Sequence, residues 1–219
     1  MKTIRKLIPE KKLPLIFGVF YTVGLLLYFL PDTRLLFLWL TPLTLPGALA
    51  VVLIHHRAWN IKTIIIFTGV FILSFLTEMA GVATGNIFGA YEYLTTLGIK
   101  INDTPLIIGI NWLLLIYGTN SLAGKLCNNR VCIILAGSTF MVLYDVVLEI
   151  AAPHLNMWQF ENTFPPPENY LSWFGLSMVF HALFVIFRVE TTNRAGRVMV
   201  IAQFLFFGIL SGYFLFAGK

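Results

Sequence analysis

Seven long apolar stretches alternate with short polar segments along the whole chain. They cover residues 13–30, 35–54, 62–80, 105–123, 131–152, 170–187 and 198–217. A membrane helix needs about 20 mainly apolar residues to cross a hydrocarbon core of about 30 Å. In lipid the backbone must satisfy its own hydrogen bonds, which makes each stretch helical. The pattern predicts an all-α, polytopic transmembrane bundle of about seven helices. Pro42 and Pro46 predict a kink or an interruption in the second helix.

The composition supports a single integral membrane domain over residues 1–219. Of the residues, 58% are hydrophobic and 11% are charged, whereas a soluble domain has about 45–50% apolar and about 25% charged residues. A chain with so few charges cannot cover its surface in water. The apolar run 13–30 is not followed by a small-residue cleavage site, so we interpret it as an uncleaved first helix.

The basic residues are distributed unevenly across the predicted bundle, whose two ends lie on opposite sides. Twelve of the 15 Lys and Arg residues fall on the side of the N-terminus: Lys2, Arg5, Lys6, Lys11, Lys12, Arg57, Lys62, Lys125, Arg130, Arg188, Arg194 and Arg197. The other side has Arg34, Lys100 and Lys219. Cytoplasmic loops of membrane proteins carry an excess of Lys and Arg. We therefore expect a cytoplasmic N-terminus in a multi-pass cell membrane protein, in the inner membrane if the organism is Gram-negative, and we expect no nucleic acid partner.

A weak internal repeat relates two parts of the chain. In each part an acidic helix end is followed by an aromatic outer loop, of about residues 81–104 and 153–169, and then by a proline. A tryptophan follows seven residues after that proline in both parts: Pro105 precedes Trp112, and Pro166 precedes Trp173. Parallel repeats of this kind often place a binding site at their interface. Chance similarity is the alternative interpretation.

Acidic residues inside the predicted spans are the first candidates for chemistry. Only Glu78, Asp145 and Glu149 lie there. A carboxylate at the centre of a membrane helix costs about 2.5–3.5 kcal/mol on insertion scales, so such residues usually have a function. Asp145 and Glu149 are four residues apart and share one helix face. Two carboxyls on one face disfavour joint ionisation, which suits a general acid beside a general base. The alternative is hydrogen bonding that only holds helices together.

Aromatic residues near the predicted outer interface form a second candidate set: Tyr91, Tyr93, Trp112, Trp158, Tyr170 and Trp173. They form either an interfacial belt or the wall of an apolar substrate slot that stabilises a cation. His181, four residues after Ser177, and Asn111 are either packing residues or groups that position water or relay a proton. Ser74, Thr77 and Gly81 share a helix face with Glu78, as a polar stripe or as a packing face.

Several other kinds of site are not indicated. Cys127 and Cys132 lack the spacing of a metal site, and we expect thiols that are buried or at the interface. The chain has no G-x-S-x-G, H-E-x-x-H, P-loop or G-x-G-x-x-G motif. A retinal Schiff base needs a lysine in the middle of a span, and none is present. We therefore expect no metal and no cofactor.

One stretch of sequence resembles a known family. From Glu78 to Tyr91 the chain matches the pattern E-x-x-G-x-x-T-G-x-x-F-G-x-Y at every fixed position. This pattern is similar to that of the membrane-embedded carotenoid 1,2-hydratases, the CruF type, also described as bisanhydrobacterioruberin hydratase-like. Asp145 to Glu149 resembles the family's D-x-x-x-D segment, and Trp158 with the run 169–173, which includes Asn169, resembles a later part. The resemblance covers about residues 70–190.

The chain also departs from the family pattern. Glu149 replaces the usual second Asp, and Ile150 stands where a proline commonly follows. Three prolines at 165–167 replace a glycine-containing turn, and Ser172 replaces a glycine. The acid chemistry survives a change from Asp to Glu, whereas the altered loop leaves the substrate open.

The resemblance implies hydration of the terminal double bond of an acyclic (ψ) carotenoid end group to a tertiary alcohol. The substrate would be of the lycopene or γ-carotene class, and the partners would be this carotenoid, water and membrane lipid. Asp145 and Glu149 would be the acid and base, and Glu78 would orient water or share the proton. Two alternatives remain open: a lycopene-type cyclase, which begins with the same protonation, and a proton-coupled carrier or lipid-binding protein.

Overall fold

The computed structural model describes residue 5 and residues 8–216. Within them, seven helices are long and apolar enough to cross a membrane. They are α2 (Leu13–Phe29), α3 (Arg34–His55), α4 (Ile61–Thr84), α5 (Ile107–Leu126), α6 (Arg130–Ala151), α7 (Pro167–Ile186) and α8 (Arg194–Phe216). Short 3-10 turns, η1 (Glu10–Lys12) and η2 (Pro31–Thr33), precede α2 and α3. Each helix lies within a few residues of a predicted span, which confirms the all-α multi-pass bundle.

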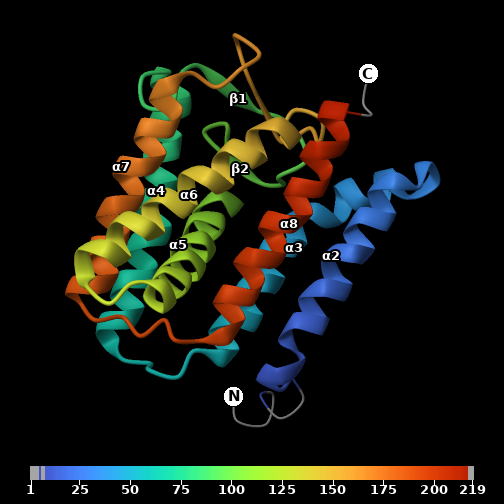
Figure 1. The fold of residues 1–219 in the computed structure, drawn as a ribbon. Coiled ribbons are helices and arrows are strands. Elements are labelled where there is room, and N and C mark those ends of the chain that lie inside the picture. The colour runs from blue at the N-terminus through green and yellow to red at the C-terminus, as the bar shows by residue number, and fades with distance from the viewer. Residues whose placement is uncertain (1–4, 6–7, 217–219) are drawn as a thin grey trace.

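The helices run alternately up and down, so the two ends of the chain lie at opposite ends of the molecule (Figure 1). The connections 56–60, 127–129 and 187–193 lie at the same end as the N-terminus, where most of the basic residues are found. We call this the basic end. The longer connections, which carry the aromatic residues, lie at the other end, which we call the aromatic end.

Local sequence explains where the helices of the repeat begin and end. The side chain of Asn60 accepts a hydrogen bond from the Thr63 amide at the start of α4. Asn129 does the same for the Cys132 amide at the start of α6. An asparagine at this position satisfies one of the free amides of the first turn. Gly85 ends α4 with a φ of 67°, a left-handed conformation that suits glycine.

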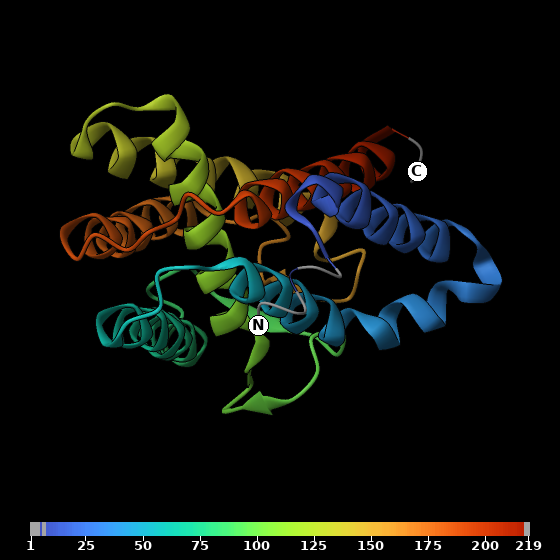
Figure 2. The same ribbon diagram turned by 90° about the horizontal axis from the view of Figure 1, so that it is seen from below.

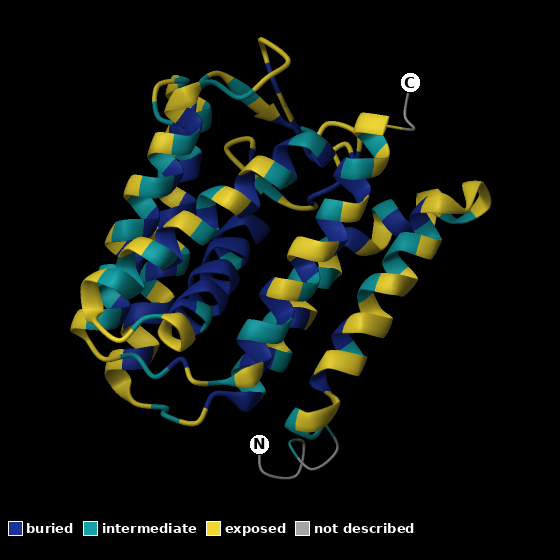
Figure 3. Cartoon of the chain, viewed as in Figure 1, coloured by how far each residue is buried: buried dark blue, intermediate teal, exposed yellow. Residues whose placement is uncertain are grey.

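Helix α5 lies in the middle of the bundle, with contacts to α3, α4, α6, α7 and α8 (Figure 2). Most of its residues are buried, in contrast to the mixed surfaces of the other helices (Figure 3). The outer faces carry exposed apolar side chains, among them Leu15, Ile65 and Leu171. Such faces suit lipid, because in a membrane an exposed leucine is solvated by hydrocarbon.

The packing of α4 to α7 supports the repeat. Helix α4 packs on α5 as α6 packs on α7, whereas α5 meets α6 far more extensively than α7 meets α4. Strand β1 (Tyr91–Tyr93) follows the first acidic helix, and strand β4 (Trp158–Phe160) follows the second. The two pair antiparallel, with Glu92 opposite Gln159 at the centre. The Gln159 amide donates to the Glu92 carboxylate over 2.7 Å. The two halves of the repeat are therefore joined by their equivalent loops.

Three features differ from the expectations from sequence. The outer loops are partly ordered as strands, since β2 (Lys100–Ile101) and β3 (Thr104–Pro105) also pair. Helix α3 is not interrupted at Pro42 and Pro46 but continues through both as one helix, and the hydroxyl of Thr41 donates to the Phe37 carbonyl near the first proline.

The two cysteines are the third difference. Cys127 and Cys132 form a disulfide across the turn between α5 and α6, so the expectation of thiols was wrong. The asparagine cap of α6 turns the chain back at Asn129, and this brings the two Cα atoms to 5.6 Å, a separation that a disulfide can bridge.

Candidate active site

Glu78 is buried near the end of α4 and accepts three hydrogen bonds. The phenols of Tyr91 and Tyr93 donate to its Oε2 over 2.6 and 2.8 Å. The indole of Trp112 on α5 donates to its Oε1 over 2.8 Å. An ionised carboxylate only accepts hydrogen bonds, so three donors satisfy it without any proton of its own. The structure thus brings four of the predicted site residues together.

The two tyrosines on β1 stay protonated and can therefore donate hydrogen bonds to Glu78. Burial, and after it the charge of Glu78, raises the pKa of Tyr91 and of Tyr93 well above the usual phenol value. Both phenols therefore keep their protons at neutral pH. Their side chains point to the same face of the short strand because residues two apart in a strand share a face.

Asp145 and Glu149 lie one turn apart on α6, and both are buried. The Asn169 amide donates to Asp145 Oδ2 over 2.7 Å. The Trp158 indole donates to Glu149 Oε2 over 3.0 Å. Asp145 Oδ1 is buried and has no hydrogen-bond partner among the described residues. Each carboxyl thus has one donor, whereas Glu78 has three.

A small chamber separates Glu78 from Glu149. Its volume is about 20 Å³, and a buried water needs about 10–15 Å³ measured in this way. Both carboxylates line it, and Asp145 does not. The other lining residues are mainly aromatic or amide side chains: Phe88, Tyr91, Tyr93, Ile108, Asn111, Trp112, Trp158, Phe160, Asn169 and Trp173. The chamber has room for one water molecule between two carboxyl groups.

Two tryptophans from the two halves of the repeat meet at this chamber. The Trp112 and Trp173 rings are stacked, with centroids 4.4 Å apart and planes at 27°. An aromatic face is electron-rich and attracts a cation placed over it. The chamber therefore combines buried acids with aromatic faces.

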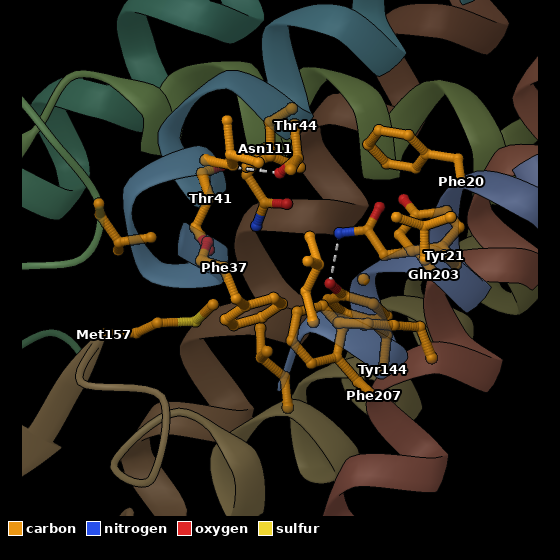
Figure 4. A pocket seen from close by; sticks show the side chains of 18 of the residues that line it. Phe20, Tyr21, Phe37, Thr41, Thr44, Asn111, Tyr144, Met157, Gln203 and Phe207 are labelled. Carbon is orange, nitrogen blue, oxygen red and sulfur yellow. Dashed lines mark hydrogen bonds between the residues drawn. The ribbon is translucent and has the colours of Figure 1, made fainter. Parts of the chain in front are cut away.

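A larger apolar cavity of about 280 Å³ adjoins the chamber (Figure 4). Its walls come from α2, α3, α5, α6 and α8, with Met157 and Trp158 from the outer loop. Ile108, Asn111 and Trp158 line both spaces, so these residues form a wall that the two spaces share. The wall residues Phe20, Val23 and Leu40 are also 41%, 47% and 39% exposed at the bundle surface. The cavity is thus bordered by side chains that face lipid.

Some predicted candidates lie elsewhere. Tyr170 and His181 line neither space. His181 is fully buried, and its ring nitrogens lie 3.0 Å from the Thr119 hydroxyl and 2.7 Å from the Ser177 carbonyl. The hydroxyls of Ser74 and Thr77 donate to carbonyls of their own helix. Glycine is required at position 81, because a Cβ there would lie 2.6 Å from the Phe88 ring.

Apart from Asn111 and Trp158, the sequence did not indicate the residues of the larger cavity. Its apolar walls on α2, α3 and α8 look the same in sequence as lipid-facing positions. Gln203 is different, since an amide within an apolar span is a signal that could have been used. Within residue 5 and residues 8–216, no group of three or more His, Cys, Asp or Glu side chains could hold a metal ion.

Comparison with known proteins places the chain in a family. Neither the curated proteins nor the solved structures contain a significant match. A family model described as "Carotenoid biosynthesis protein" matches residues 39–218, which include both halves of the repeat, the carboxylates and most of the larger cavity. With this match over most of its length, the chain belongs to the carotenoid biosynthesis protein family.

Proposed function

We propose that this protein hydrates the terminal double bond of an acyclic carotenoid end group, as a carotenoid 1,2-hydratase of the CruF type. One observation carries the proposal: a chamber for a single water, lined by Glu78 and Glu149, shares part of its wall with an apolar cavity large enough for an isoprenoid end group. Hydration needs those two reactants side by side, and holding them in place removes much of the entropic barrier.

The carboxyls have different surroundings, and this suggests their roles. Glu78 has three donors and suits the ionised form. Glu149 has one donor and lies beside Asp145, so the pair holds a shared proton more readily than two charges. Glu149 is then the general acid that faces the chamber. Asp145 is a positioning residue that shares this proton, and Glu78 is the base that holds the water.

The reaction balances without a further reactant. The Glu149 proton is transferred to the less substituted alkene carbon, which leaves a tertiary cation. The chamber water forms a C–O bond to the tertiary cationic carbon, and one of its protons passes to Glu78. The next water entering the chamber carries the proton from Glu78 back to Glu149. The faces of Trp112, Trp158 and Trp173 stabilise the cation while it exists.

The experiment is expression of the chain in cells that accumulate lycopene or γ-carotene, followed by liquid chromatography and mass spectrometry of the pigments. We expect a more polar pigment, heavier by one water, with an unchanged chromophore. An isomer of unchanged mass and shifted absorption would show a cyclase instead. Unchanged pigment from well-expressed protein would contradict the proposal and favour the carrier.

The carboxyl variants refine the test. Glu149→Gln and Glu78→Gln keep the size of the side chain and remove the acid or base. Both should stop product formation in cells that still contain the folded protein. Glu92→Gln is the matched control, since Glu92 is an exposed carboxylate on β1 outside the chamber.

A further inference from the structure

The larger cavity contains a pair of polar side chains that the proposed reaction does not use. Gln203 on α8 donates from its amide nitrogen to the Tyr144 hydroxyl on α6 over 2.6 Å. Both side chains line the cavity, and Figure 4 shows the pair against its apolar wall. Gln203 is 2% exposed and Tyr144 is 1% exposed. The pair is therefore buried in a mainly apolar space.

The hydrogen-bonding capacity of this pair is only half used. Gln203 Oε1 is buried without a partner among the described residues. The Tyr144 hydroxyl accepts from Gln203, and its own hydrogen has no acceptor in the described part of the chain. Exchanging the amide nitrogen and oxygen of Gln203 does not change this result: the nitrogen then becomes the free donor and the phenol oxygen the free acceptor. In both orientations the pair offers one donor and one acceptor.

The two threonines that line the cavity differ from this pair. The hydroxyls of Thr41 and Thr44 donate to carbonyls of α3, over 2.9 and 2.8 Å. Both hydroxyls already donate within their own helix, so they need no hydrogen-bond partner from a ligand. An unpaired buried polar atom is unfavourable, and a site with such atoms discriminates strongly for a ligand that pairs with them.

We propose that Gln203 and Tyr144 form a subsite for a hydroxyl group on the end of an isoprenoid ligand. A hydroxyl both donates and accepts, and so it matches the free acceptor and the free donor together. A carbonyl accepts only and would leave the oxygen of Gln203 unpaired. This subsite rests on the proposed function only in taking the ligand to be a carotenoid. The hydroxyl belongs either to the substrate before reaction or to the alcohol that hydration produces.

Binding tests the subsite without turnover when it is measured on a protein that Glu149→Gln makes inactive and that is otherwise unaltered. The probes are lycopene, which has no oxygen, and 1,1′-dihydroxylycopene, which has a tertiary hydroxyl at each end and no terminal alkene to hydrate. The purified protein in detergent is incubated with either pigment, and the bound pigment is measured by absorbance after size exclusion. We expect about tenfold tighter retention of the diol.

Two variants test whether Gln203 and Tyr144 cause the preference for the diol. Gln203→Leu and Tyr144→Phe should each abolish the preference for the diol while lycopene binds as before. Thr44→Val, at a satisfied hydroxyl of the same cavity, should leave the preference unchanged. Equal retention of both pigments by the protein with Glu149→Gln alone, a preference that survives both variants, or no retention of either pigment would overturn the proposal.

Measuring hydration activity distinguishes the hydroxyl subsite from the proposed hydratase function. A preference for the diol without hydration of any carotene would support the subsite and contradict the hydratase. Hydration of a carotene together with equal retention of both probes would support the hydratase and contradict the subsite. In an active enzyme, inhibition by the diol that disappears in Gln203→Leu would identify the hydroxyl as that of the product. Faster reaction of an alkene that already carries an end-group hydroxyl would identify it as that of the substrate.

Discussion

The indole of Trp112 on α5 stacks on that of Trp173 on α7, although the two residues are 61 positions apart in the chain, with α6 between their helices. Only Trp112 also donates to Glu78. Trp173→Phe should therefore weaken the stack alone, at a cost of about 0.5–1.5 kcal/mol. Trp112→Phe should also remove a hydrogen bond to a carboxylate, a further cost of about 1.5–3 kcal/mol. Initial hydration rates should fall more for Trp112→Phe, and equal losses would contradict the role of its N–H.

The exchange Glu149→Gln should lower the hydration rate by about 10²–10⁴-fold, the usual contribution of a general acid. The amide oxygen can still accept from Trp158, so the fold should be kept. The measurement is the initial rate in membranes that contain equal amounts of protein. Activity close to that of the Glu92→Gln control would exclude Glu149 as the acid.

A larger side chain in the larger cavity should weaken carotene binding and leave the three carboxyl groups unchanged. Gly24 lines the cavity, and a Cβ there would lie 3.2 Å from the Phe206 ring. Gly24→Leu should therefore raise the apparent KM for a carotene. Gly18→Leu on the same helix is the control, because no atom lies within 4 Å of a Cβ at that position. Equal KM values for the two variants would argue that the substrate binds elsewhere.

Glycine at position 137 should be needed for stability. A Cβ there would lie 2.4 Å from the His181 ring, and overpacking costs about 1–3 kcal/mol. Gly137→Ala should lower the melting temperature in detergent. Gly175→Ala, where the added Cβ meets nothing within 4 Å, should leave it unchanged or raise it, since alanine favours a helix. A stable Gly137→Ala protein would show that His181 can move aside.

The distribution of basic residues predicts the orientation of the protein. A periplasmic reporter enzyme fused after residue 219 should be active, and the same enzyme fused before residue 1 should not. The Cys127–Cys132 disulfide lies at the basic end. A cytoplasmic basic end faces a reducing compartment, where disulfides are rare, so a disulfide that persists in fresh membranes would also argue against this orientation. An active N-terminal fusion would reverse the orientation.

The sequence predicted the helices well because a backbone in lipid must form its own hydrogen bonds, which makes each apolar span helical. Apolar length alone placed all seven to within a few residues. In the sequence, Glu78 and the aromatic residues Tyr91, Tyr93 and Trp112 were separate candidates, and only the structure shows that all three aromatic residues hydrogen-bond to Glu78. By contrast, helical spacing put Asp145 and Glu149 on one face, but it could not show that only Glu149 reaches the chamber. That depends on how α6 packs against α5 and α7.

Long-range pairing and cavities were not visible in the sequence. Strands β1 and β4 are three residues each, too short for a clear alternation of apolar and polar positions. The register that sets Tyr93 opposite Trp158 is fixed only when both acidic helices are in place. The larger cavity depends on which apolar faces of α2, α3 and α8 turn inward, and lipid-facing and cavity-facing leucines have the same chemistry.

The pairing of β1 with β4 also bears on how such a site could diverge. An antiparallel pair centred on Glu92 and Gln159 is the contact that two copies of one half would make in a symmetric dimer. In that dimer every change would appear twice, and both acids would keep the same neighbours. With the two halves fused in one chain, each acid can change alone. Glu78 now has three donors, while Asp145, 67 residues later, has one. A chain that holds both halves can therefore surround its two acids differently, which a symmetric dimer cannot do.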